Sequence, residues 1–289
     1  VKHMGDGTVI VLGYKALTIL QFNPSTPLLT HTLHHISSLR DLVLDARIVR
    51  DTEQRSLLLI GYAQNFLDIY SLDEERVIAT VKCPVVCVLF SLAIAPLDNI
   101  EHDGVTIASG TAMGQIVLWT AGVELSTSSV AISSPPPVCV SNTLSGHKGI
   151  IWKVRWNTAK DRIVSVSDDR TVRVWDVASG EELFCGFGHI CRVWDVIFVG
   201  KGDKAVVTCG EDAVVKLWDV ESQKCVMTMQ GHANKHIWCV NMLQITNNCT
   251  MDSVLLSGGN DCCVNLWPVS VHTLLNAEPQ IICQKEAST

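Results

Sequence analysis

The sequence predicts an all-β fold built from repeated units, and two observations support this prediction. First, residues 162–177, 205–220 and 254–269 share one pattern: an apolar run, a turn ending in Asp, and an alternating strand that closes on Trp. Second, polar and apolar residues alternate with a period of two, and Gly, Asp and Asn occupy the turns. This alternation indicates four short β-strands per unit and almost no helix.

Three weaker copies of the pattern extend the array upstream. They cover residues 105–121, 57–72 and 9–22, and they end on Trp119, Tyr70 and Phe22. The aromatic anchors at 22, 70, 119, 175, 218 and 267 are therefore 43 to 56 residues apart. We expect six units, near 5–30, 40–80, 85–125, 145–180, 187–225 and 230–272. The longest gap contains the "SSPPP" stretch at 133–137, which we expect to be a surface loop between two units.

Composition limits the possible classes of protein. The 289 residues are 47% hydrophobic and 18% charged, which suffices for a large core. The net charge of −7 argues against a generally basic nucleic-acid binder. The longest apolar run, 85–96, is too short for a membrane span of about 20 residues. The twelve cysteines lack paired spacing, so we expect a cytoplasmic protein with reduced thiols, many of them buried.

Four residue types recur in register in the three strong units. The sets are His147, Ser165, Asp169 and Trp175; His189, Thr208, Asp212 and Trp218; and His232, Ser257, Asp261 and Trp267. Each His follows a Gly, and each Asp stands six residues before its Trp. Gly-His near the start and Trp-Asp near the end of a 40–45-residue unit resembles the WD-repeat family.

This resemblance implies a β-propeller. Six blades are visible, and a seven-bladed ring that lacks an N-terminal blade is expected. The chain starts at Val1, so we interpret residues 1–289 as a fragment that lacks its native N-terminus. The resemblance also implies that each recurring set is a buried hydrogen-bonded chain running from Trp through the hydroxyl and His to Asp.

The sequence contains no convincing catalytic, cofactor or metal site. Ser, His and Asp are the components of a nucleophilic triad, but a catalytic set should occur once, in a cleft, and not in every unit. Neither a phosphate-binding P-loop nor a dinucleotide-binding glycine motif is present. Cys83-x3-Cys87, the Cys262–Cys263 pair and His232-x3-His236 lack the second half of a zinc spacing. We therefore expect a protein that is not an enzyme.

A second tryptophan follows each Gly-His pair, at Trp152, Trp194 and Trp238. It directly follows the first apolar residue of the innermost strand, out of phase with the core. Bases lie nearby, namely Lys148, Lys153, Arg192, Lys235 and His236. The rings either form a partner surface, by stacking on a base or guanidinium or as an interface hot spot, or pack together in the channel. Asp195 and Cys239 interrupt the basic run, which weakens the nucleic-acid alternative.

The strong half also resembles a narrower family. "SGHKGIIWKVRW", "VSDDRTVRVWDV", "CGFGHICRVWDV" and "CGEDAVVKLWDV" follow one another as in the large WD-repeat proteins that partner the tRNA anticodon-loop ribose 2′-O-methyltransferase. This resemblance implies that residues 1–289 are the N-terminal propeller of a longer protein with several propellers. It also implies a non-catalytic subunit that binds the methyltransferase and helps to place tRNA for methylation of the wobble-nucleotide ribose. S-adenosylmethionine would belong to the partner enzyme. The alternative is a general WD-repeat adaptor, such as a ubiquitin-ligase substrate receptor or a signalling scaffold.

Overall fold

The computed structural model describes residues 2–3, 8–22, 29–51, 55–97, 104–122, 138–200, 202–247, 250–268 and 280–283. The described residues form β-strands joined by turns, with one short 3₁₀ helix, η1 (His232–Asn234). Within these ranges, no helix has the length and apolar character needed to cross a membrane. The strands form two compact units: residues 1–112 with 116–143, and residues 113–115 with 144–289.

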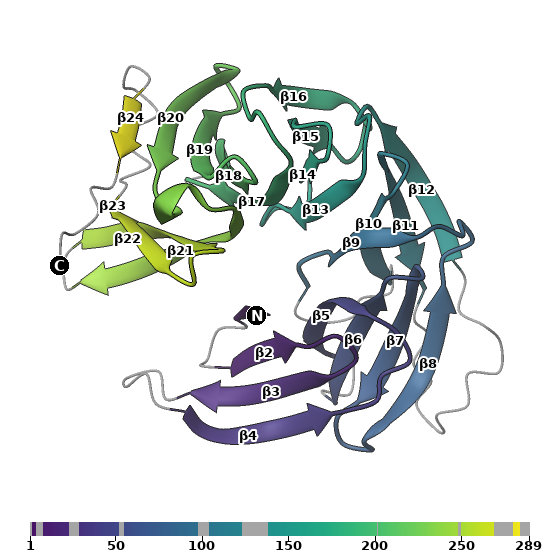
Figure 1. Cartoon of the computed structure of the whole chain (residues 1–289). Helices are drawn as coiled ribbons and strands as arrows, with labels where there is room; N and C mark the ends of the chain where they lie inside the picture. The colour runs from purple at the N-terminus through teal and green to yellow at the C-terminus, as the bar shows by residue number, and fades with distance from the viewer. Residues whose placement is uncertain are drawn as a thin grey trace. The chain divides into compact units, whose positions relative to one another are not determined.

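Unit 1 contains three four-stranded sheets (Figure 1). The first consists of β1 (Lys2–His3), β2 (Thr8–Leu12), β3 (Leu17–Phe22) and β4 (Leu29–Ile36). The second consists of β5 (Val43–Arg50), β6 (Ser56–Tyr62), β7 (Phe66–Ser71) and β8 (Arg76–Lys82). The third consists of β9 (Leu89–Ile94), β10 (Val105–Thr111), β11 (Gln115–Ala121) and β12 (Val138–Ser145).

Unit 2 contains the sheets of the three strong repeats. The fourth sheet consists of β13 (Ile151–Trp156), β14 (Arg162–Ser167), β15 (Val172–Asp176) and β16 (Glu182–Gly186). The fifth consists of β17 (Val193–Val199), β18 (Ala205–Gly210), β19 (Val214–Asp219) and β20 (Lys224–Gln230), with β24 (Gln280–Cys283) parallel to β20. The sixth consists of β21 (Ile237–Asn247), β22 (Thr250–Gly259) and β23 (Val264–Pro268).

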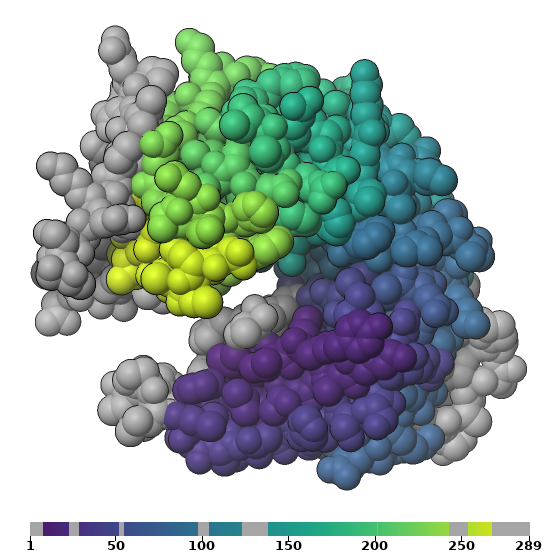
Figure 2. Space-filling model, in the orientation of Figure 1, coloured from purple at the N-terminus to yellow at the C-terminus, as the bar shows by residue number. Residues whose placement is uncertain are grey.

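These six sheets, with antiparallel neighbours in sequence order, are the blades of an all-β propeller fold, as the repeats predict. Within each unit, neighbouring sheets bury their facing sides against each other, so the core of the unit lies between its sheets. Val207, Leu217 and Met229 of the fifth sheet pack against Val240 and Trp267 of the sixth. Figure 2 shows the atoms of these two sheets in contact, green against yellow. The expected seventh blade and the single ring stay predictions.

Two details of the sequence interpretation were wrong. Strand β12 joins β11 in the third sheet, so residues 123–137, which lie outside the described residues, connect two strands of one blade and not two blades. Among the ten described cysteines, all unpaired, only Cys83 and Cys209 are buried. Many of the others lie on edge strands or in turns, where a small apolar side chain meets solvent; Cys139, Cys239, Cys262 and Cys263 are exposed.

A β-bulge recurs at one register position in five of the described sheets. The pairing of the first strand with the second skips one residue, and that residue is always apolar. The skipped residues are Leu44, Phe90, Trp152, Trp194 and Trp238. A bulge inserts an extra residue into a strand and redirects its side chain. It therefore explains why these tryptophans are out of phase with the core pattern.

Candidate interaction surface

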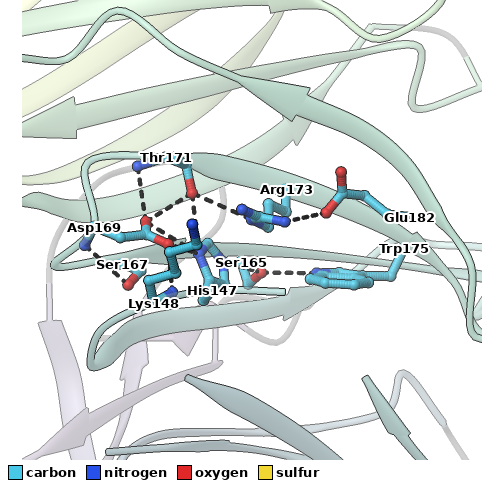
Figure 3. Close-up of polar contacts among 9 residues, drawn as sticks. All are labelled: His147, Lys148, Ser165, Ser167, Asp169, Thr171, Arg173, Trp175 and Glu182. Carbon is cyan, nitrogen blue, oxygen red and sulfur yellow. Dashed lines mark hydrogen bonds and ion pairs between the residues drawn. The ribbon is translucent and has the colours of Figure 1, made fainter. Parts of the chain in front are cut away.

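The structure brings the four recurring residues of the fourth sheet into one hydrogen-bonded chain (Figure 3). Trp175 Nε1 on β15 donates to Ser165 Oγ on β14 over 2.8 Å. Ser165 Oγ lies 2.8 Å from His147 Nε2, and His147 Nδ1 lies 3.0 Å from Asp169 Oδ2. Asp169 also accepts the Lys148 backbone N–H at 2.8 Å. The chain thus fastens the Gly-His loop to the β14–β15 turn.

The fifth and sixth sheets contain the same chain. In the fifth sheet the distances are 2.8 Å for Trp218 to Thr208, 2.7 Å for Thr208 to His189, and 2.8 Å for His189 to Asp212. In the sixth they are 2.8 Å for Trp267 to Ser257, 2.8 Å for Ser257 to His232, and 2.9 Å for His232 to Asp261. We call each of these three sets a clasp.

The direction of the hydrogen bonds in a clasp follows from the groups involved. A carboxylate only accepts, so His Nδ1 donates to Asp; the neutral ring then accepts the hydroxyl proton at Nε2, and the hydroxyl oxygen accepts the indole N–H. These are the proton positions of a catalytic triad. However, Ser165 and Thr208 are 0% exposed and Ser257 is 1% exposed. A substrate carbonyl cannot reach these oxygens, so the clasps hold the fold together.

The clasps lower the pKa of their aspartates. Burial alone would raise the pKa of Asp169, but the hydrogen bonds from His147, Thr171 and the Lys148 backbone outweigh it, and the pKa falls well below its ordinary value. The pKa of Asp212 is lowered in the same way against burial, by His189 and the Ile190 backbone. Asp261 also has a lowered pKa because His232 and the Cys263 backbone outweigh the effect of burial.

The third sheet has a substitute clasp that the sequence did not reveal. Trp119 Nε1 donates to Ser109 Oγ at 2.9 Å, as in the strong repeats. Ser109 Oγ then donates to Asn65 Oδ1 at 2.7 Å, and Asn65 comes from the β6–β7 turn of the preceding sheet. Asn65 is 1% exposed and donates to the Val85 carbonyl at 2.9 Å. An alignment of repeats could not find it, because it belongs to another blade.

Among the described residues, no comparable series of hydrogen bonds surrounds the aromatic anchors of the two weakest repeats. Tyr70 on β7 is partly buried and pairs with Leu58, while Phe22 lies partly buried at the end of β3. The second sheet contains a buried ion pair instead of a clasp. Asp68, which is 1% exposed, accepts from Arg40 Nε at 3.2 Å and from Thr80 Oγ1 at 2.6 Å.

The three bulge tryptophans of unit 2 form a ladder. The rings of Trp152 and Trp194 have centroids 4.8 Å apart, and those of Trp194 and Trp238 are 5.1 Å apart. His236 meets the Trp238 ring edge-on at 5.7 Å. Trp152 and Trp194 are partly buried, whereas Trp238 is 44% exposed. The ladder therefore combines both expected arrangements: the rings pack on each other, and the last one presents a face to solvent.

The bases near the ladder differ in how they are paired. Arg192 Nε lies 2.6 Å from Asp168 Oδ1 and 3.9 Å from Glu211 Oε2, so two carboxylates balance its charge. Asp168 also accepts from Trp152 Nε1 at 3.4 Å. Lys148 and Lys235 are exposed, and Lys153 and His236 are partly buried. Within the described residues, neither exposed lysine has an ion pair.

Asp195, the acid that interrupts the basic run, points away from solvent. It is 4% exposed and accepts from the backbone N–H of Val196 at 2.9 Å and of Val240, on the neighbouring β21, at 3.2 Å. Arg155 Nη2 also contacts it at 3.1 Å. Asp195 therefore ties the first strands of two sheets together and contributes little to the surface.

Comparison with known families agrees with the repeats. The family model "WD domain, G-beta repeat" matches residues 138–176, 180–219 and 223–268, which correspond to the three sheets with complete clasps. Residues 138–268 therefore carry WD repeats. Among the described residues, no group of three or more His, Cys, Asp or Glu is arranged to hold a metal ion.

Curated relatives of this WD-repeat chain include tRNA (34-2′-O)-methyltransferase regulator WDR6 of Homo sapiens, which is 26% identical over 80% of the chain and 19% of the relative. The protein of that name from Drosophila melanogaster is 23% identical over 66% of the chain and 19% of the relative. F-box-like/WD repeat-containing protein TBL1X of Mus musculus is 25% identical over 47% of the chain and 22% of the relative. The chain thus spans about a fifth of the length of the first two.

Proposed function

We propose that this chain is part of a non-catalytic subunit that binds a tRNA ribose 2′-O-methyltransferase and helps to position tRNA for methylation of the wobble nucleotide. The observation that carries the proposal is the similarity to proteins named as regulators of such an enzyme, which extends over 80% of the chain. This similarity extends beyond the three WD repeats that the family model matches, which lie within residues 138–268.

A positioning role is physically sufficient for such a subunit. Holding a ribose hydroxyl in line with a methyl donor turns an encounter of two molecules into a reaction within one complex and lowers the barrier. A stack of packed blades offers a rigid support for this. We propose that S-adenosylmethionine binds to the partner enzyme, that this chain holds no cofactor or metal, and that the complex works in the cytoplasm.

The proposal assigns no catalytic residue to this chain. The Ser–His–Asp sets, which come closest to a reactive constellation, are buried beneath tryptophan rings. Rate enhancement in the complex would therefore come from binding and orientation, and tRNA would reach this chain through the full-length complex.

Affinity purification of the full-length protein at low salt tests the proposal. Co-purifying proteins are identified by mass spectrometry and RNA by sequencing. We expect an S-adenosylmethionine-dependent methyltransferase together with a restricted set of tRNAs, and raised salt should weaken the tRNA contacts first. Recovery of ubiquitin-ligase or signalling components without tRNA would contradict the proposal.

That contrary result would favour the second candidate, a WD-repeat interaction adaptor. The observation in its favour is the similarity to F-box-like/WD repeat-containing protein TBL1X over 47% of the chain. That similarity covers less of the chain than the first, and WD repeats occur in proteins of many functions.

A further inference from the structure

At one end of unit 2, large apolar side chains are exposed to solvent. Each Gly-His loop and each bulge tryptophan lies at this end, where the first strand of the sheet begins. Trp238 is 44% exposed and Ile190, in the loop before β17, is 74% exposed. Large exposed apolar groups that cluster on one face typically mark an interaction surface. We call Trp152, Trp194, Trp238 and Ile190 the ladder surface.

The ladder is built to hold Trp238 rigidly. Each bulge fixes a ring at the start of a strand, and each ring packs on the next at 4.8 and 5.1 Å. The indole N–H of Trp194 is buried and has no acceptor among the described residues, although buried donors are nearly always paired. An aromatic ring that its neighbours hold rigidly while one face stays exposed is typical of an interface hot spot.

The charges favour a protein partner over RNA. A single-stranded RNA site needs several ring faces in a positively charged groove, because each base brings a phosphate with it. Here the rings are tilted by 57° and 48° and cover one another, so only Trp238 offers a stacking face. Beside the ladder, Arg192 is held by Asp168 and Glu211, so its guanidinium is not available to a phosphate.

Positive charges at the edges of the ladder surface indicate the kind of protein segment that fits it. Lys148 follows His147 in the loop of the fourth sheet, and Lys235 precedes Trp238 in the loop of the sixth. Both are exposed and carry no ion pair within the described part of the chain. An apolar centre between two free lysines complements an apolar patch bordered by carboxylates.

We propose that the ladder surface is the docking site for the protein partner of this chain, through an apolar segment of that partner flanked by acidic residues. Trp238 and Ile190 form the contact, Trp152 and Trp194 support it, and Lys148 and Lys235 pair with the flanking carboxylates. The identity of the partner rests on the proposed function, in which it is the tRNA ribose methyltransferase.

Binding of the purified methyltransferase to the full-length protein, measured by biolayer interferometry, tests the inference. We expect Trp238→Ala to weaken binding about tenfold or more, and Trp238→Phe to retain most of it because a ring remains. The Lys148→Glu/Lys235→Glu double variant should slow association and reduce its salt dependence. Tyr14→Ala, at a 72% exposed aromatic residue in the β2–β3 turn of unit 1, is the matched control and should bind as the wild type does.

The outcomes separate the two proposals. If the wild type binds no methyltransferase, the proposed function fails and the docking assignment fails with it. If the wild type binds and Trp238→Ala binds equally well with an unchanged melting temperature, only the docking assignment fails. Loss of tRNA binding in Trp238→Ala with unchanged enzyme binding would also overturn it, in favour of an RNA surface.

Discussion

The fourth to sixth sheets and the second and third sheets solve the same structural problem in different ways. Each uses buried polar groups to hold the loop that precedes its first strand. The strong repeats use a clasp whose four residues come from one repeat, whereas the third sheet uses Asn65 from its neighbour. The second uses Asp68 with Arg40. A repeat can therefore lose the His, hydroxyl, Asp and Trp residues of the clasp and still keep a buried polar connection.

The largest expected effect concerns the aromatic anchors. Trp218→Ala removes a side chain that is 2% exposed, packs against Phe184 and donates to Thr208. We expect a loss of about 3–5 kcal/mol in the free energy of unfolding. Tyr70→Ala in the second sheet should cost clearly less, because that ring is only partly buried. Urea denaturation of both variants measures this, and equal losses would remove the distinction between the two regions.

The polar connections should give the next largest effects. Asp212→Ala leaves the buried Nδ1–H of His189 without its acceptor and frees the ring that Thr208 contacts, and we expect a loss of about 1–3 kcal/mol. Asn65→Ala should cost a similar amount, because it leaves Ser109 without an acceptor. Thermal melts test both variants. An unchanged melting temperature for Asp212→Ala would show that the clasp contributes no stability.

Acid should affect the two regions differently. The pKa values of Asp169, Asp212 and Asp261 are lowered by folding, so their stabilising effect is complete above the unfolded pKa of about 4 and is lost progressively as the pH falls from there towards the lowered pKa of the folded state. Asn65 does not titrate. Hydrogen exchange followed between pH 5 and about pH 3 should therefore show β13–β23 losing protection before β9–β11 does. Simultaneous loss in both regions would contradict the assignment.

The smallest expected effect lies in the loop of the sixth sheet. His232, Ala233 and Asn234 have left-handed backbone angles, with φ of 56°, 45° and 58°. Glycine adopts these angles without the steric cost paid by alanine, although it loses more chain entropy on folding. We expect Ala233→Gly to raise the free energy of unfolding by less than about 1 kcal/mol, as measured in urea. A destabilisation would show that this backbone is not strained.

The sequence predicted much of the fold and only part of the site. Aligned copies of one repeat were enough to identify residues such as His189 and Trp218, and the resemblance to WD repeats implied that they form a hydrogen-bonded chain. Asn65 was missed because its partner Ser109 is 44 positions away in a different blade. The ladder was left open between two arrangements, since alternation alone does not reveal a bulge at Trp194. The sequence pattern also does not show that Arg192 forms ion pairs with Asp168 and Glu211.

The most direct test of the central claim is a reconstituted methylation assay. Purified tRNA ribose methyltransferase, S-adenosylmethionine and substrate tRNA are incubated with and without the full-length protein, and 2′-O-methylation of the wobble nucleotide is quantified by mass spectrometry. We expect the protein to accelerate methylation by the enzyme. In the absence of the enzyme, we expect the protein to transfer no methyl group. A rate unaffected by the protein, or methyl transfer by the protein alone, would contradict this claim.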